Sequence, residues 1–153
     1  MLQFMAENFT TILVIFGMLM SIVLSGIGSA KGGAMIGKAA AALISEQPEK
    51  FGQSLVLQMM SASQGLYGFI IAFLIFTNLG EGLTGLNALR CFGAGCIMGL
   101  AGYFTAIEQS KTATAGIQIL AKKPEHSTKG VLYSAMIETY AIFAFVIAVL
   151  III

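Results

Sequence analysis

One acidic side chain stands deep within the last apolar segment of the chain. Glu138 lies in a mostly aliphatic and aromatic run from about residue 130 to 153, and the basic residue nearest to it there, Lys129, is nine positions away. An ionisable side chain in a low-dielectric environment is energetically costly and is therefore usually functional. We predict that Glu138 binds a cation or a proton.

Uncharged oxygen donors are predicted at the same level. Counted from the proline of the nearest loop at 1.5 Å per residue, Gln64 lies about 24 Å along its helix, Gln109 about 22 Å and Glu138 about 21 Å. Ser63 is adjacent to this level, and Tyr67, one turn beyond Gln64, can donate its hydroxyl to the Glu138 carboxylate. Helical spacing therefore predicts a cluster of one carboxylate, two carboxamides and two hydroxyls.

This set of groups suits a hard monovalent cation, because neutral oxygens replace its hydration shell and one carboxylate cancels its charge. A proton would need only Glu138, and a divalent ion would demand more carboxylates. The cluster therefore favours Na⁺ over H⁺. The alternative for Gln64 and Gln109 is that they form ordinary hydrogen bonds between helices.

A second acid, Glu108, also falls within an apolar segment. Lys111 lies three residues further on, which places it on the same helical face. We expect Glu108 to form a structural ion pair with Lys111, or with Lys31 across helices, rather than to bind the ion.

The elements that must position these groups are membrane helices. The chain has 153 residues, 58% hydrophobic and only 10% charged, with a mean hydropathy of +0.91, so lipid must be its solvent over much of its length. Short loops separate four apolar segments, each longer than the roughly 20 residues of one crossing. We predict an all-α membrane protein of two helical hairpins, residues 1–79 and 80–153, with spans at about 10–44, 51–79, 86–120 and 130–153.

Charge distribution predicts the orientation. Seven of the eight basic residues lie near the loops 45–50 and 122–129, and only Arg90 lies near the middle loop. The positive-inside rule places those two loops in the cytoplasm and both termini outside a cell membrane. The net charge of +1 supplies no basic field for nucleic acid.

The two hairpins resemble each other, which indicates duplication. Residues 47–50 (QPEK) recur as 123–126 (KPEH), and Gln64 aligns with Glu138. The first span carries a small residue at every fourth position, a spacing that lets helices approach closely in lipid. A stripe this long favours a closed ring of identical copies over a single four-helix bundle. Its members are Gly17, Ser21, Ser25, Ser29, Gly33, Gly37 and Ala41.

Four motifs together resemble the proteolipid of V-type ATPases, in particular the membrane-rotor component (subunit K) of sodium-translocating enzymes. They are residues 26–32 (GIGSAKG), 64–69 (QGLYGF), 116–118 (GIQ) and 137–141 (IETYA). The resemblance implies a homo-oligomeric ring that turns against a stator membrane subunit. It also implies central-stalk subunits that couple the ring to ATP hydrolysis in a separate head, so the chain is not an enzyme on its own.

The resemblance further implies the ligands of Na⁺. They are the Met60 backbone carbonyl, the side-chain oxygens of Ser63, Gln64 and Gln109, and the Glu138 carboxylate, with Tyr67 hydrogen-bonded to Glu138. Related chains can carry Pro-Gly where this one has Ser61-Ala62, so no proline frees the Met60 carbonyl from its helical hydrogen bond.

Two alternatives stay open. The chain could be an H⁺-carrying V-type proteolipid, or a small four-helix exchanger of cations for protons. An exchanger for bulky cations should offer aromatic residues rather than carboxamides beside its glutamate. The sequence has no Ser/His/Asp or Cys/His constellation, which argues against hydrolytic chemistry.

Overall fold

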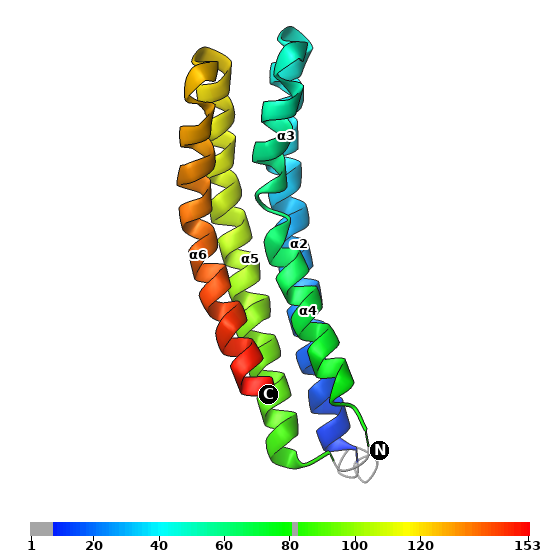
Figure 1. The fold of residues 1–153 in the computed structure, drawn as a ribbon. Coiled ribbons are helices and arrows are strands. Elements are labelled where there is room, and N and C mark those ends of the chain that lie inside the picture. Colours follow the sequence, from blue (N-terminus) through cyan, green and yellow to red (C-terminus); the bar gives the residue numbers. More distant parts are fainter. Residues whose placement is uncertain (1–7, 81–82) are drawn as a thin grey trace.

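Two helical hairpins stand side by side in the computed structural model, which describes residues 8–80 and 83–153 (Figure 1). All regular elements of these residues are helices: α2 (Phe9–Glu46), η1 (Pro48–Lys50), α3 (Phe51–Met59), α4 (Ser63–Thr77), α5 (Gly85–Lys122), η2 (Pro124–His126) and α6 (Ser127–Ile152). The first hairpin is α2 with α3 and α4, and the second is α5 with α6. Residues 1–7 and 81–82, which belong to the N-terminus and middle loop predicted to be extracytoplasmic, lie outside the described part.

Four helical units are long and apolar enough to cross a membrane. They are Phe9–Glu46, Pro48–Thr77, Gly85–Lys122 and Pro124–Ile152. Many large apolar side chains are exposed on them, among them Phe73, Phe104 and Leu150. A soluble protein would not expose so much apolar surface, so the chain is a multi-pass membrane protein.

The contact between α2 and α5 is the most extensive in the fold, and it depends on small residues. A Cβ atom on Gly17 would lie 2.7 Å from the Cys91 carbonyl oxygen, and one on Gly28 would lie 2.7 Å from the Tyr103 Cα atom. Neither position has room for a side chain. The two long helices therefore pack backbone to backbone, as small residues permit in lipid.

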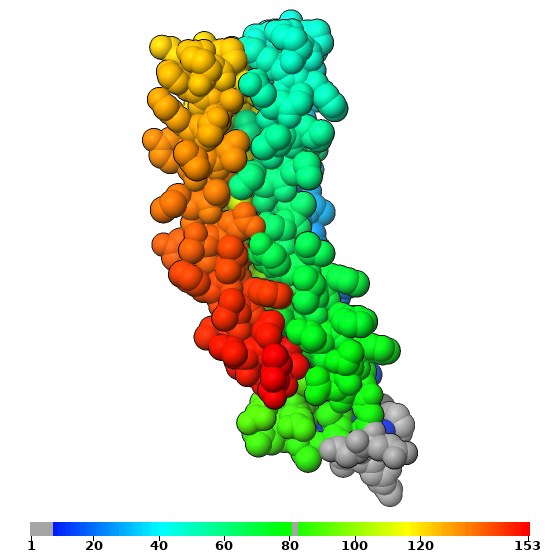
Figure 2. Space-filling view, viewed as in Figure 1, coloured from blue at the N-terminus to red at the C-terminus, as the bar shows by residue number. Residues whose placement is uncertain are grey.

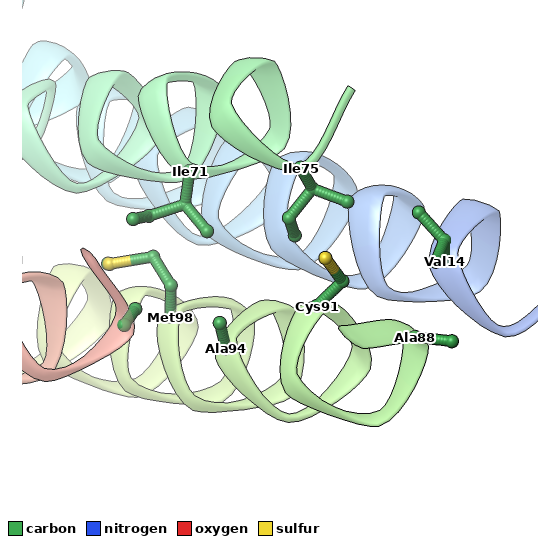
Figure 3. Close-up of a cluster of buried hydrophobic side chains, with 8 residues drawn as sticks. Val14, Ile71, Ile75, Ala88, Cys91, Ala94 and Met98 are labelled. Atoms are coloured by element: carbon green, nitrogen blue, oxygen red, sulfur yellow. The ribbon is translucent and has the colours of Figure 1, made fainter. Parts of the chain in front are cut away.

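Two apolar clusters hold the four helical units together. The cluster towards the termini gathers side chains from all four of them, most of which are labelled in Figure 3: Val14, Ile71, Ile75, Ala88, Cys91, Ala94, Met98 and Ala148. The cluster towards the loops consists of Ile36, Ala40, Leu43, Leu57, Ala113, Ile117 and Leu120. Gln64 and Gln109 lie between these clusters in sequence, so apolar packing fixes the helices on both sides of them.

The second apolar segment, predicted as one span, is interrupted. α3 ends at Met59 and α4 begins at Ser63. Between them the Met60 amide donates to Leu57 at 3.3 Å and the Ala62 amide donates to Met59 at 3.0 Å, so the chain makes tight three-residue turns. The fourth segment begins at Ser127, three residues before its predicted start, because η2 leads directly into α6.

Candidate ion-binding site

Three helical units converge on the Glu138 carboxylate. Glu138 is partly buried on α6. The Tyr67 hydroxyl of α4 donates to its Oε1 atom at 2.8 Å, and the Gln109 amide of α5 donates to its Oε2 atom at 3.4 Å. Both carboxylate oxygens therefore have a partner, and no basic side chain of the described residues is one of them.

The two carboxamides are fully buried and bonded to each other. Gln64 and Gln109 have no exposed surface, and the Gln64 amide donates to the Gln109 Oε1 atom. The Ser63 hydroxyl oxygen lies 3.4 Å from the Gln64 Oε1 atom, and its single proton is shared between this atom and the Met60 carbonyl oxygen. A continuous polar chain thus runs from Ser63 through both carboxamides to Glu138. Such a buried network is stable only because its members are hydrogen-bonded.

The helix interruption exposes a backbone oxygen beside this network. Among the described residues, the Met60 carbonyl accepts a hydrogen bond from the Ser63 hydroxyl at 3.3 Å and none from a backbone amide. The break occurs at Ser61-Ala62, without proline. A serine hydroxyl competes with the helical amide for a carbonyl, and Ser63 does so here. The carbonyl has a second lone pair available to a ligand.

The donor set is hard and carries one formal negative charge. The oxygens linked by these hydrogen bonds are the carboxylate of Glu138, the carboxamide oxygens of Gln64 and Gln109, the Ser63 hydroxyl and the Met60 carbonyl. In residues 8–80 and 83–153, no three His, Cys, Asp or Glu side chains come together as a metal cluster. These ligands suit a monovalent hard cation rather than a transition metal.

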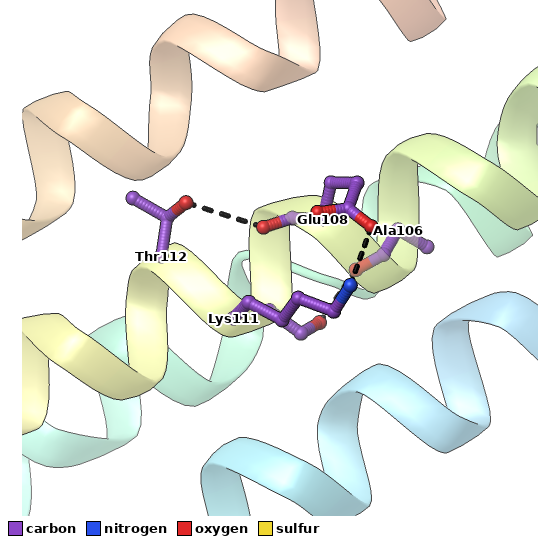
Figure 4. Close-up of polar contacts among 5 residues, drawn as sticks. Ala106, Glu108, Lys111 and Thr112 are labelled. Carbon is purple, nitrogen blue, oxygen red and sulfur yellow. Dashed lines mark hydrogen bonds and ion pairs between the residues drawn. The ribbon is translucent and has the colours of Figure 1, made fainter.

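Glu108 is engaged elsewhere. Its Oε1 atom lies 2.6 Å from the Lys111 Nζ atom, and the two side chains are 58% and 56% exposed (Figure 4). This is the expected ion pair along one helix. Lys31, the alternative partner, instead donates to the Tyr103 hydroxyl at 3.3 Å and lies over the Tyr103 ring.

Two serines hold backbone groups beside the site through hydrogen bonds between helices. These bonds were not predicted from the sequence. Ser29 of α2 accepts a hydrogen bond from the Gly65 amide at 2.8 Å, in the first turn of α4, where no side chain of α4 provides a cap. Ser134 of α6 is buried and donates to the Gln109 carbonyl at 3.2 Å. Ser29 belongs to the stripe interpreted as packing, so its polar role could be found only from the α2–α4 register.

A duplicated four-span membrane protein with one carboxylate among buried carboxamides belongs to the class of ion-carrying proteolipids. The comparisons with known proteins specify the family. The family model of the ATP synthase C subunit matches residues 16–75 and again 92–151, one match for each hairpin. The chain belongs to this family.

Individual relatives are subunits of V-type ATPases and of an A-type ATP synthase. The chain is 53% identical over 146 residues to the V-type sodium ATPase subunit K of Enterococcus hirae, which covers 95% of this chain and 94% of the relative. It is 34% identical over 134 residues to the A-type ATP synthase subunit K of Methanocaldococcus jannaschii, covering 88% and 59%. It is 26% identical over 135 residues to the V-type proton ATPase 16 kDa proteolipid subunit of Entamoeba dispar, covering 88% and 77%. The resemblance to V-type ATPase proteolipids is confirmed.

Proposed function

We propose that this chain is the ion-carrying subunit of the rotor ring of a V-type ATPase, and that its cargo is Na⁺ bound at Glu138. The observation that carries the proposal is the polar chain Ser63–Gln64–Gln109–Glu138, with Tyr67 closing it. A proton would need none of the carboxamides. The identity of 53% to a sodium ATPase subunit supports the same ion.

Na⁺ would enter by replacing hydrogen bonds within the cluster. The hydrogen bond between Gln64 and Gln109 breaks. Both carboxamide oxygens then turn to the ion together with the Glu138 carboxylate. The Ser63 hydroxyl and the Met60 carbonyl complete the ligands. Tyr67 keeps its hydrogen bond to Glu138 and holds the carboxylate in place.

Neutralisation allows the site to move past lipid. The bare Glu138 carboxylate is held back by the cost of transferring a charge to low dielectric, whereas the Na⁺-bound site has no net charge. The α6 surface beside it exposes Tyr133, Met136 and Tyr140, as expected for an outer wall of the ring. A basic side chain of the stator would attract ionised Glu138 and release the ion.

The partners and orientation follow from the same assignment. The stator membrane subunit provides the entry and exit paths, and the central stalk links the ring to ATP hydrolysis in a separate head. In this assignment hydrolysis belongs to the head and not to this chain. Loops 45–50 and 122–129 face the cytoplasm and the termini face outside, which fits the basic residues at the loop end. The exchanger alternative is set aside because the chain belongs to the family of the ATP synthase C subunit.

Carbodiimide labelling of the intact complex tests the ion. At constant pH and ionic strength, Na⁺ should slow the labelling of Glu138, whereas choline should not. The Glu138→Gln variant should not be labelled, and the Glu108→Gln variant should be labelled and protected like the parent. Labelling that is indifferent to Na⁺ would contradict the sodium site and favour a proton.

A further inference from the structure

The loop ends of the two hairpins lie at the same end of the molecule (Figures 1 and 2). They differ in charge. The last turn of α2 carries Glu46 and no basic residue, and Glu49 follows it. The second hairpin carries basic residues at the corresponding place: Lys122, Lys123, His126 and Lys129. One end is therefore acidic and the other basic.

Within the chain, a lysine of the first hairpin caps the C-terminal end of α5. Lys50 is buried, and its Nζ atom donates to the Ala121 carbonyl at 3.0 Å. The last carbonyls of a helix lack intrahelical donors and form the negative end of the helix dipole, so a cation there is stabilising. This contact joins the two hairpins.

The end of α2 has no such cation. In the repeat, Ala121 corresponds to Ser45, and among the described residues no donor reaches the Ser45 carbonyl. Glu46 is exposed and forms no ion pair within that part of the chain. An acid at the negative end of a helix is unfavourable. The C-terminal end of α2 therefore lacks the partner that the end of α5 has.

The basic side chains lie on the opposite edge of the molecule, where His126 also lies 4.0 Å from the Glu125 carboxylate. A cavity of about 390 Å³ opens between α5 and the start of α6, lined in part by Gln118, Lys122, Lys123, His126 and Lys129. On α5, Gln118 and Lys122 are not buried, whereas Ile117 and Leu120 are buried in the cluster with α2. The basic edge thus faces away from the α2 of its own chain.

We infer that this basic edge docks on the acidic end of α2 in a second copy of the chain. Lys50 corresponds to His126 in the repeat, so His126 takes the role towards Ser45 of the second copy that Lys50 has towards Ala121. The inference rests on the proposed function, since it specifies a contact between neighbours in the ring.

Two observations make a second copy the occupant. The contact from the first hairpin to the second is head-to-tail, and repeating such a step generates a ring when the rotation closes. The free edge of α2 also presents a matching surface. There a groove of about 510 Å³ runs between α2 and α3 and is lined partly by Gly33, Ala34, Gly37 and Ala41, which let another helix approach closely.

Paired cysteines test the contact in the intact membrane complex. In a background with Cys91→Ala and Cys96→Ala, the variant Ser45→Cys/His126→Cys is treated with a short bifunctional thiol reagent. We expect a ladder of covalent oligomers on a denaturing gel. The matched control is Lys50→Cys/Ala121→Cys, which should be linked within one chain and stay at monomer mobility.

The outcomes separate the contact from the proposed function. If the control is linked but the test pair gives no ladder, while Na⁺ still protects Glu138 from carbodiimide, the contact is wrong and the proposed function stands. Loss of Na⁺ protection in the unmodified complex contradicts the proposed function instead.

A charge reversal provides a second test. His126→Glu should lower the temperature at which the purified oligomer dissociates, because it places an acid against the negative C-terminal end of α2 in the second copy, whereas His126→Lys should not lower it. An unchanged temperature in His126→Glu would overturn the contact and indicate that the basic edge binds another anion, such as a lipid phosphate.

Discussion

The two hairpins have the same helical arrangement, yet their second helical units, Pro48–Thr77 and Pro124–Ile152, differ near the polar cluster. In the first hairpin Gln64 lies sixteen positions after Pro48, and the helix is interrupted between them. In the second, Glu138 lies fourteen positions after Pro124, and α6 is continuous. The longer copy thus contains the interruption that frees a carbonyl, and the shorter copy carries the charge.

This difference shows how duplication divided the work. The first hairpin contributes only neutral oxygens to the polar cluster, with Gln64 fully buried. The second contributes its one carboxylate, Glu138, at a partly buried position, together with the buried carboxamide of Gln109. A carboxylate at both Gln64 and Glu138 would place two negative charges in one low-dielectric cluster, where they repel strongly. The repeats have therefore become complementary and are no longer interchangeable.

The largest effect is expected from Glu138→Gln. A neutral amide cannot cancel the charge of the ion, so Na⁺ uptake by the intact complex should fall at least ~100-fold, about 3 kcal/mol at 1.4 kcal/mol for each factor of ten. Uptake of ²²Na⁺ into vesicles measures it.

The same variant allows the comparison to be broken directly. Adding Gln64→Glu moves the carboxylate to the first hairpin without changing the number of charges. Because Gln64 is fully buried, away from the α6 surface, uptake should not recover. Recovery would show that the hairpins are still interchangeable.

The next largest effect is expected at the contact between α2 and α5, where the two hairpins meet. In Gly95→Ala the new methyl group would collide with the Gly17 backbone of α2, so we expect a loss of about 1–3 kcal/mol in stability. The repeat counterpart of Gly95 is Leu19, which is exposed in the first hairpin. Thermal unfolding of the purified protein measures the change. Gly52→Ala is the control, because a Cβ atom there meets no atom within 4 Å.

A smaller effect is expected from Tyr67→Phe. The variant loses the hydroxyl that donates to Glu138 at 2.8 Å, a hydrogen bond to a charged group worth about 1.5 kcal/mol. Na⁺ should bind about tenfold more weakly, as measured by the Na⁺ concentration that half-protects Glu138 from carbodiimide. Tyr140→Phe, on the exposed surface of α6, should leave this concentration unchanged. Equal effects of both variants would argue against the tyrosine contact.

The smallest effect is expected from Glu108→Gln. Glu108 is paired with Lys111 on an exposed face of α5 and has no contact with Glu138, so the same half-protecting Na⁺ concentration should stay within about twofold. A larger change would make Glu108 a second charge of the site and remove the contrast between the hairpins.

Much of the fold was predictable because lipid simplifies the problem. Long apolar segments, short loops and repeated motifs indicated four helical spans in two hairpins. The interruption at residues 60–62 was not predictable from propensity, since this stretch has neither proline nor glycine. The structure shows the Ser63 hydroxyl beside the Met60 carbonyl at this interruption, a contact that the sequence alone does not reveal.

The polar cluster was partly predictable for the same reason. Counting residues from the loop prolines placed Gln64, Gln109 and Glu138 at one depth, and helical spacing placed Tyr67 beside them. Ser29 and Ser134 were not predicted as part of the site. In sequence, a serine that only packs between helices cannot be distinguished from one that hydrogen-bonds to the backbone of another helix. Their partners are a backbone amide and a backbone carbonyl on other helices, so only the register between helices identifies them.

In the ring that we propose, having one carboxylate for every four helices sets the number of ions carried per revolution. A ring of given circumference then moves fewer ions per revolution than one with a carboxylate on every hairpin. The free energy of each ATP is divided among fewer ions, so each ion can be driven against a steeper electrochemical gradient. A glutamine at position 64, where the second hairpin has Glu138, therefore goes with fewer ions per revolution and a larger gradient for each ion.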